Sequence, residues 1–135
     1  MSKNGKADKK RKPTHHTQWA AQFAVASELC KREYQVALTM GNHPKADLMA
    51  ISPKGVPFTV DVKGLAAKNP WFVRRKAKTD NLFYVLACVP PGKANQFFIM
   101  SQATANELIR GDTSSSDILW NTGLPHLDKW DILPA

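Results

Sequence analysis

The order of apolar patterns along the chain predicts a mixed α/β domain in which helices flank a central sheet of about five strands. Residues 17–32 have the periodicity of a helix, and short alternating segments in the middle of the chain are typical of strands. Residues 82–89 are almost wholly apolar, as expected for a strand buried on both faces. Because 43% of the 135 residues are hydrophobic, the chain suits one core. We therefore expect a single domain over residues 17–135.

The expected helix at residues 17–32 buries one face against this core. At 100° per residue, one stripe consists of Trp19, Phe23, Ala26 and Cys30, flanked by Val25 and Leu29. Gln22 is the polar residue within the apolar arc. Its amide either faces a functional site or is a buried group that hydrogen-bonds the end of a strand.

The expected strands cover residues 34–39, 46–51, 56–63, 82–89 and 96–100. A turn joins the second strand to the third as a hairpin, through Pro53, Lys54 and Gly55. Alternation along the third strand puts Asp61 and Lys63 on one face.

Three further segments complete the expected order of elements. Residues 64–80 are expected to be a basic loop, because Asn69 and Pro70 oppose a continuous helix. Ser101 is the expected N-cap of a helix that continues to Arg110 and is closed by Gly111. Apolar residues between Trp120 and Leu133 are expected to form a C-terminal flap packed on the core.

The net charge of +8 is concentrated at the start of the chain, where residues 1–12 carry six basic side chains against Asp8. Such a segment has too little apolar surface to offset its ordering entropy, so we expect a disordered basic tail over residues 1–16. Attraction to a phosphate backbone is one interpretation of the tail. A solubilising segment, a targeting signal and an expression artefact are the alternatives.

The sequence also limits the compartment and the class of protein. No apolar run approaches the roughly 20 residues that a membrane span requires, and no secretory signal is recognisable. Cys30 and Cys88 lack the spacing of a zinc site or a disulfide framework, so we expect both to be reduced core residues. We expect an intracellular protein, in the cytoplasm or nucleoid, with no membrane partner.

The chemistry-bearing residues are Asp47, Asp61 and Lys63. Phosphodiester hydrolysis needs a hard divalent cation, which prefers oxygen ligands, and benefits from a nearby ammonium. If the hairpin forms, Asp47 at the start of one strand lies near Asp61 on the next. The alternative is that Asp47 caps a loop and that Asp61 and Lys63 form a solvated ion pair, which would stabilise the fold by less than about 1 kcal/mol.

This pattern resembles the PD-(D/E)XK superfamily, which has the restriction-endonuclease-like fold, and its small resolvase-like or homing-endonuclease-like members. The matching residues are Pro44-Lys45-Ala46-Asp47 and Asp61-Val62-Lys63, preceded by the helix at residues 17–32. The resemblance covers about residues 17–110. It implies a DNA endonuclease in which Asp47, Asp61 and the carbonyl of Val62 bind Mg²⁺, or Mn²⁺ in its place, while Lys63 assists the attacking water. It also makes a homodimer plausible, because two strands must be cut.

The chain departs from the family on the helix, where the glutamate that commonly faces the site is replaced by an amide, at Gln22 in our interpretation. An amide is a poorer Mg²⁺ ligand than a carboxylate. The alternative function is therefore a catalytically inactive nucleic-acid-binding module on the same fold. An interaction or inhibitor protein that uses the fold as a scaffold is a third hypothesis.

The loop at residues 64–80 is the predicted DNA-contacting surface. Cations attract phosphates, and the rings of Trp71 and Phe72 would be able to stack on bases unless they fold back onto the core. The predicted nucleic-acid-binding side chains are Lys54 on the hairpin turn and Lys68, Arg74, Arg75, Lys76 and Lys78 on the loop.

Overall fold

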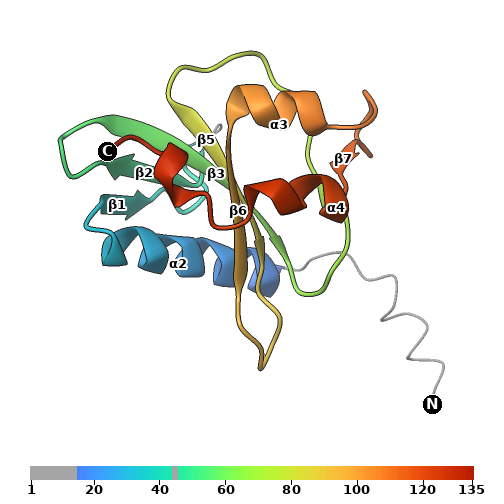
Figure 1. Cartoon of the computed structure of the whole chain (residues 1–135), viewed down its shortest axis with the longest axis horizontal. Helices are drawn as coiled ribbons and strands as arrows, with labels where there is room; N and C mark the ends of the chain where they lie inside the picture. The colour runs from blue at the N-terminus through green and yellow to red at the C-terminus, as the bar shows by residue number, and fades with distance from the viewer. Residues whose placement is uncertain (1–14, 44–45) are drawn as a thin grey trace.

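The computed structural model describes residues 15–43 and 46–135, and Figure 1 shows the arrangement of their helices and strands. The predicted tail lies outside the described residues over 1–14, whereas His15 and His16 already belong to the first helix. In chain order the elements are α2 (His15–Lys31), β1 (Gln35–Leu38), β2 (Leu48–Ile51), β3 (Pro57–Leu65), β4 (Trp71–Phe72), β5 (Leu82–Cys88), β6 (Gln96–Ser101), α3 (Gln102–Leu108), β7 (Asp117–Ile118), α4 (Trp120–Gly123), η1 (Leu124–His126) and η2 (Trp130–Ile132).

The central sheet has five strands in the order β1-β2-β3-β5-β6. All neighbouring strands are antiparallel except β3 and β5, which are parallel. This mixed sheet, flanked by helices, confirms the predicted fold class. Because β3 and β5 are parallel, the chain must cross from one end of the sheet to the other between them, and residues 66–81 make this crossing. Within the crossing, β4 pairs with β7 in a small second sheet.

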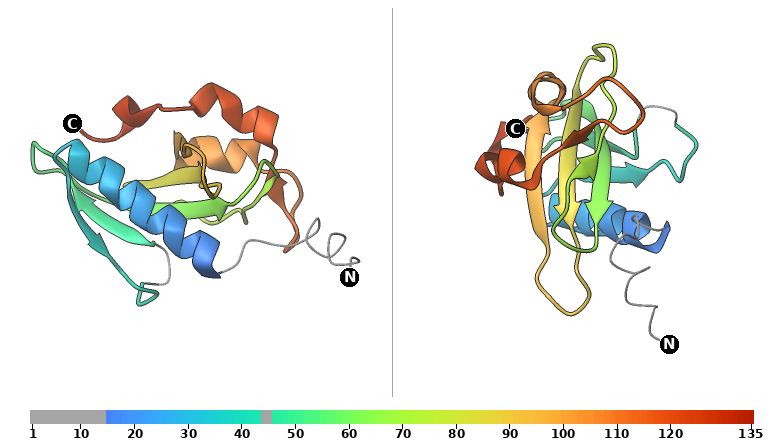
Figure 2. Two further views of the ribbon diagram at one scale, coloured as in Figure 1. Left: turned by 90° about the horizontal axis from the view of Figure 1, so that it is seen from below. Right: turned by 90° about the vertical axis from the view of Figure 1, so that its right-hand side faces the viewer.

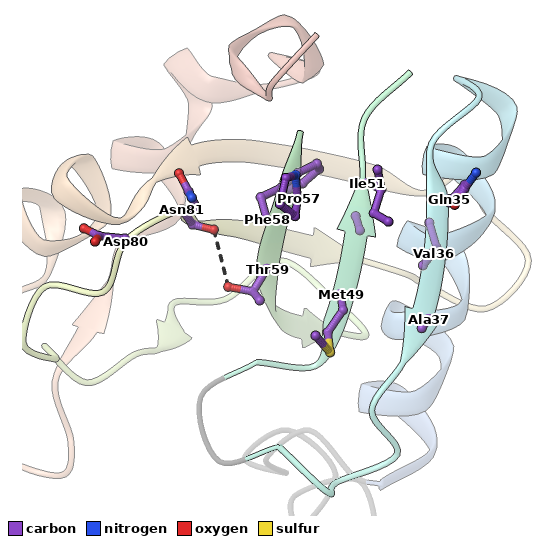
Figure 3. Close-up of a pocket in the computed structure, with 11 residues that line it drawn as sticks. Gln35, Val36, Ala37, Met49, Ile51, Pro57, Phe58, Thr59, Asp80 and Asn81 are labelled. Atoms are coloured by element: carbon purple, nitrogen blue, oxygen red, sulfur yellow. Dashed lines mark hydrogen bonds between the residues drawn. The ribbon is translucent and has the colours of Figure 1, made fainter. Parts of the chain in front are cut away.

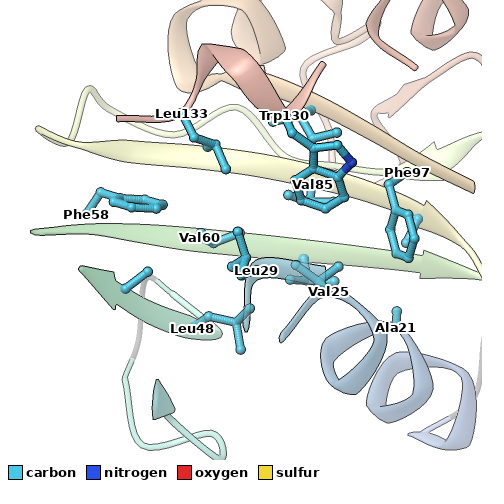
Figure 4. Close-up of a cluster of buried hydrophobic side chains, with 14 residues drawn as sticks. Ala21, Val25, Leu29, Leu48, Phe58, Val60, Val85, Phe97, Trp130 and Leu133 are labelled. Carbon is cyan, nitrogen blue, oxygen red and sulfur yellow. The ribbon is translucent and has the colours of Figure 1, made fainter. Parts of the chain in front are cut away.

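Helix α2 covers one face of the sheet, but with a different stripe from the predicted one. Its buried apolar residues are Ala21, Val25 and Leu29, which pack with side chains of β2, β3, β5 and β6 (Figure 4). Phe23 is 54% exposed and Cys30 is also exposed, so the stripe through these two residues is wrong. The small side chain of Ala21 lies against Gly64 of β3, an approach too close for an aromatic ring.

The opposite face of the sheet packs against α3 and the crossing. The largest fully buried side chains in the core on this side include Trp71 of the crossing, Tyr84 of β5 and Phe98 of β6. Ser101 is the N-cap of α3, as predicted, and its side chain accepts a hydrogen bond from the Thr104 backbone N–H. The helix ends at Leu108, earlier than predicted, because Arg110 pairs with Asp117 in a β-bridge.

The C-terminal segment follows the β6 edge of the sheet, where Leu127 forms a bridge with Phe98. Figure 2 shows this segment across one side of the molecule. Trp130 and Leu133 are buried in the α2-side core, which confirms that this part packs on the core, while Ile132 is 42% exposed. In the described part of the chain, no helix is both long enough and apolar enough to span a membrane.

The close approach of α2 to β3 at Gly64 predicts a cost for any side chain there. A Cβ at position 64 would lie 2.6 Å from the Cβ of Ala21 and 3.2 Å from the carbonyl oxygen of Thr17. We expect Gly64→Ala to lower the free energy of unfolding by about 1 to 3 kcal/mol, measured by urea denaturation. In a double-mutant cycle, Ala21→Gly should cost less in the Gly64→Ala background than in the wild type. Equal costs in the two backgrounds would contradict the predicted clash.

Candidate active site

Two carboxylates lie near each other, Asp61 on β3 and Asp47 just before the start of β2. The ladder between these strands pairs Leu48 with Val60, and the Asp47 backbone N–H donates to the Val60 carbonyl at 2.9 Å. Asp47 therefore lies just before β2, and its backbone bonds to Val60 rather than to Asp61. The charges of Asp61, Lys63 and Lys76 all act on its carboxylate, which lies near them. The Asp47 carboxylate accepts a hydrogen bond from the Val62 N–H at 2.8 Å, which fixes its position. The structure thus brings together the two predicted aspartates.

Asp61 is buried, at 4% exposure, between two ammonium groups. The Lys76 Nζ lies 2.7 Å from its Oδ2 and donates a hydrogen bond to it. The Lys63 Nζ lies 3.3 Å from Oδ1, close enough for an ion pair but without hydrogen-bond geometry. Among the described residues, this Oδ1 has no hydrogen-bond partner. Both oxygens of Asp61 therefore already face an ammonium group, and a further cation would have to compete with these groups.

Lys76 was predicted as a nucleic-acid contact, and its proximity to Asp61 was missed. Its position depends on α3, whose amide side chains hold the crossing. The Asn106 amide donates to the Lys76 carbonyl at 3.1 Å, and the Gln102 amide bonds both the Ala77 carbonyl and the Thr79 N–H. Sequence patterns could not place Lys76, because the fold of this irregular segment follows from these long-range contacts.

In the described part of the chain, Gln18 is the glutamine of α2 that hydrogen-bonds the end of β3. Its Nε2 donates to the Val62 carbonyl at 2.7 Å, and its Oε1 accepts from the Gly64 N–H at 3.2 Å. Gln22, the predicted helix residue, lies one turn further along α2 and is 6% exposed. The spacing of four residues between the two glutamines was a signal that either of them would face the strand end.

Burial is the largest influence on the pKa values of Asp47 and Tyr84. Burial raises the pKa of Asp47, and the charge of Asp61 raises it further. The Val62 N–H, Lys63 and Lys76 act in the opposite direction. Burial and the charge of Asp61 together raise the pKa of Tyr84 to about 12. Tyr84 is the register partner of Asp61 on β5, so its neutral side chain borders the site on the β5 side.

The donor set fits a divalent cation of the Mg²⁺ type. In residues 15–43 and 46–135 no group of three or more His, Cys, Asp or Glu side chains is placed to hold a metal. Mg²⁺, however, is commonly bound through one or two carboxylates and retains several waters. Asp47 and Asp61 supply these carboxylates, and a metal at the Asp61 Oδ1 would compete with the ammonium of Lys63, which lies 3.3 Å from this oxygen. The Val62 carbonyl accepts from Gln18, so its use by a metal would require this amide to shift.

The remaining predicted contacts divide into two groups. Lys54, Lys68, Arg74 and Lys78 are exposed, although Lys54 lies on the turn at the far end of the β2-β3 hairpin from Asp47. Arg75 instead anchors the crossing to the end of α3, through the carbonyls of Ile109 and Gly111 and the carboxylate of Asp112. Trp71 is 1% exposed and belongs to the core, whereas Phe72 is 49% exposed.

A separate groove lies on the uncovered face of β1, β2 and β3, and its lining is mainly apolar (Figure 3). Met49 and Ile51 of β2 line it, and Thr59 hydrogen-bonds the Asn81 carbonyl at its border. The described lining includes no lysine or arginine, so its chemistry does not suit a phosphate.

Comparisons with protein-family models, with curated proteins and with solved structures find no match to this chain. The assignment of function therefore rests on the geometry of the carboxylate site.

The raised pKa of Asp47 predicts a pH-dependent effect of its replacement. Its proton is bound more tightly in the folded state, so the stability that this group contributes is present below its ordinary pKa of 3.8 and is lost as pH rises through the raised value. In EDTA, the wild type should therefore lose stability relative to Asp47→Asn as the pH rises from about 3 to about 7. The difference between their free energies of unfolding should grow by ~1.4 kcal/mol for each unit by which folding raises the pKa of Asp47. Urea denaturation across this range measures the difference, with Asp128→Asn at an exposed position as the control. A constant difference would contradict the assigned environment.

The Tyr84 hydroxyl is buried and has no hydrogen-bond partner among the described residues. Since an unsatisfied buried hydroxyl is costly, we expect Tyr84→Phe to raise the free energy of unfolding by up to about 1 kcal/mol. Tyr34→Phe is the matched comparison, because the Tyr34 hydroxyl donates to the Pro134 carbonyl, and it should lower stability by about 1 kcal/mol. Thermal and urea unfolding measure both, and a loss of stability in Tyr84→Phe would show that its hydroxyl has a partner.

Proposed function

We propose that this protein is a metal-dependent endonuclease that hydrolyses phosphodiester bonds in DNA. The observation that carries the proposal is the proximity of Asp47 and Asp61, with the ammonium of Lys63 beside Asp61. A homodimer and an intracellular location belong to the same proposal, because a nuclease that cuts both strands needs two sites and its DNA substrate is intracellular.

The roles of the side chains follow from their positions. Asp47 and Asp61 would hold Mg²⁺ or Mn²⁺, with the Val62 carbonyl as a further ligand if Gln18 moves. When bound, the ion supplies a polarised phosphate and an attacking water of lowered pKa. Lys63 provides positive charge where the pentacovalent phosphorus would gain negative charge, and it orients the water. Exposed Arg74 and Lys78 on the crossing attract the phosphate backbone.

Cleavage of plasmid and branched DNA by the wild type and by Asp61→Asn, with Mg²⁺, Mn²⁺ or EDTA, tests the proposal. We expect cleavage by the wild type with either metal, no cleavage in EDTA, and a loss of about 100-fold or more in Asp61→Asn. Circular dichroism shows whether the variant remains folded. Asp128→Asn, which removes one exposed carboxylate, is the matched control and should cleave as the wild type does.

A specific observation favours the alternative of a catalytically inactive DNA-binding module. Gln18 occupies the Val62 carbonyl, and its neutral amide stands where a carboxylate would strengthen metal binding. This alternative gives no cleavage in any metal, together with DNA retention that needs no metal and weakens steeply with salt. Cleavage that persists in Asp61→Asn would refute the assigned site, and retention that is insensitive to salt would refute the binding module.

A further inference from the structure

Lys76 is the described cationic residue whose side chain hydrogen-bonds the carboxylate of Asp61. Its ammonium donates to Oδ2 at 2.7 Å, whereas Lys63 approaches Oδ1 at 3.3 Å without a hydrogen bond. Lys63 is two residues from Asp61 on β3, but Lys76 reaches the site from the crossing on the α3 side. Since Asp61 is 4% exposed, its charge requires a partner in the absence of any other cation.

The backbone around Lys76 is held independently of the carboxylates. The carbonyls of Lys76 and Ala77 and the N–H of Thr79 all bond to amide side chains of α3. Arg75 adds hydrogen bonds to the carbonyls of Ile109 and Gly111. Loss of the ion pair with Asp61 would therefore free the Lys76 side chain alone, and its ammonium would remain within one side-chain length of the site.

We propose that Lys76 is a positioning residue that acts as the internal counter-ion of Asp61 in the free protein and is displaced when a divalent cation binds. The inference rests on the proposed metal site and adds a competitor to it. Asp61 already pairs with two ammonium groups, so a divalent ion at this carboxylate adds repulsion that is relieved when Lys76 moves away. The side chain of Lys76 is 32% exposed, which gives it a path out, and the displaced ammonium is then available to a substrate phosphate.

Mn²⁺ binding, followed by the electron paramagnetic resonance of free Mn²⁺, tests this exchange without reference to activity. We expect Lys76→Met to lower the Mn²⁺ dissociation constant about 3- to 10-fold, because the competing cation is removed. Lys76→Arg should restore the weaker affinity of the wild type. Lys93→Met, which removes an exposed charge from the turn between β5 and β6, is the control and should leave the constant unchanged.

The outcomes separate this inference from the proposed function. If Lys76→Met binds Mn²⁺ as the wild type does and Asp61→Asn abolishes binding, the metal site stands and the competition is refuted. Absence of Mn²⁺ binding in every variant refutes both. A measurement on the wild type does not depend on the folding of variants: reductive methylation of Lys76, relative to Lys78, should become several-fold faster with Mg²⁺. An unchanged ratio would also overturn the inference.

Discussion

The charge of Asp61, buried in the middle of the sheet, is the constraint on which the rest of the site depends. An isolated carboxylate at 4% exposure would be costly, and the fold offsets this cost with one ammonium from the same strand and another from the crossing. Lys76 reaches Asp61 because the crossing lies on α3. Side-chain hydrogen bonds of Gln102, Asn106 and Arg75 hold it there. The same crossing also buries Trp71 and Val73 in the core, so its position serves both the packing and the charge of Asp61.

The two faces of the sheet differ in the side chains that they bury. The α2 side is almost purely apolar, and the close contact there between Ala21 and Gly64 sets the distance of the helix from the sheet. That distance also determines that Gln18 reaches the backbone at the end of β3. The opposite side combines an aromatic core around Trp71 with the carboxylates. Packing on one face therefore determines the backbone geometry at the site, and the other face provides its charges.

The sequence was sufficient to predict the sheet and the hairpin between β2 and β3, because these follow from local periodicity and a short turn. Prediction failed where tertiary contacts decide. The buried stripe of α2 is rotated towards Ala21 and away from Phe23, because close packing at Gly64 favours a small side chain over a hydrophobic one. Lys76 and Tyr84 were missed as neighbours of Asp61, since the crossing has no periodicity and the parallel register of β3 and β5 is not encoded in a turn.

The parallel pairing of β3 with β5 also has a consequence for the order in which the molecule assembles. The β2-β3 hairpin joins neighbours in sequence, so it is able to form early and bring Asp47 beside Asp61. The cation from the crossing arrives only after β5 has aligned and α3 has docked, which are contacts of high sequence separation. During synthesis, the hairpin would thus carry two neighbouring carboxylates before contacts with α3 hold Lys76 beside Asp61.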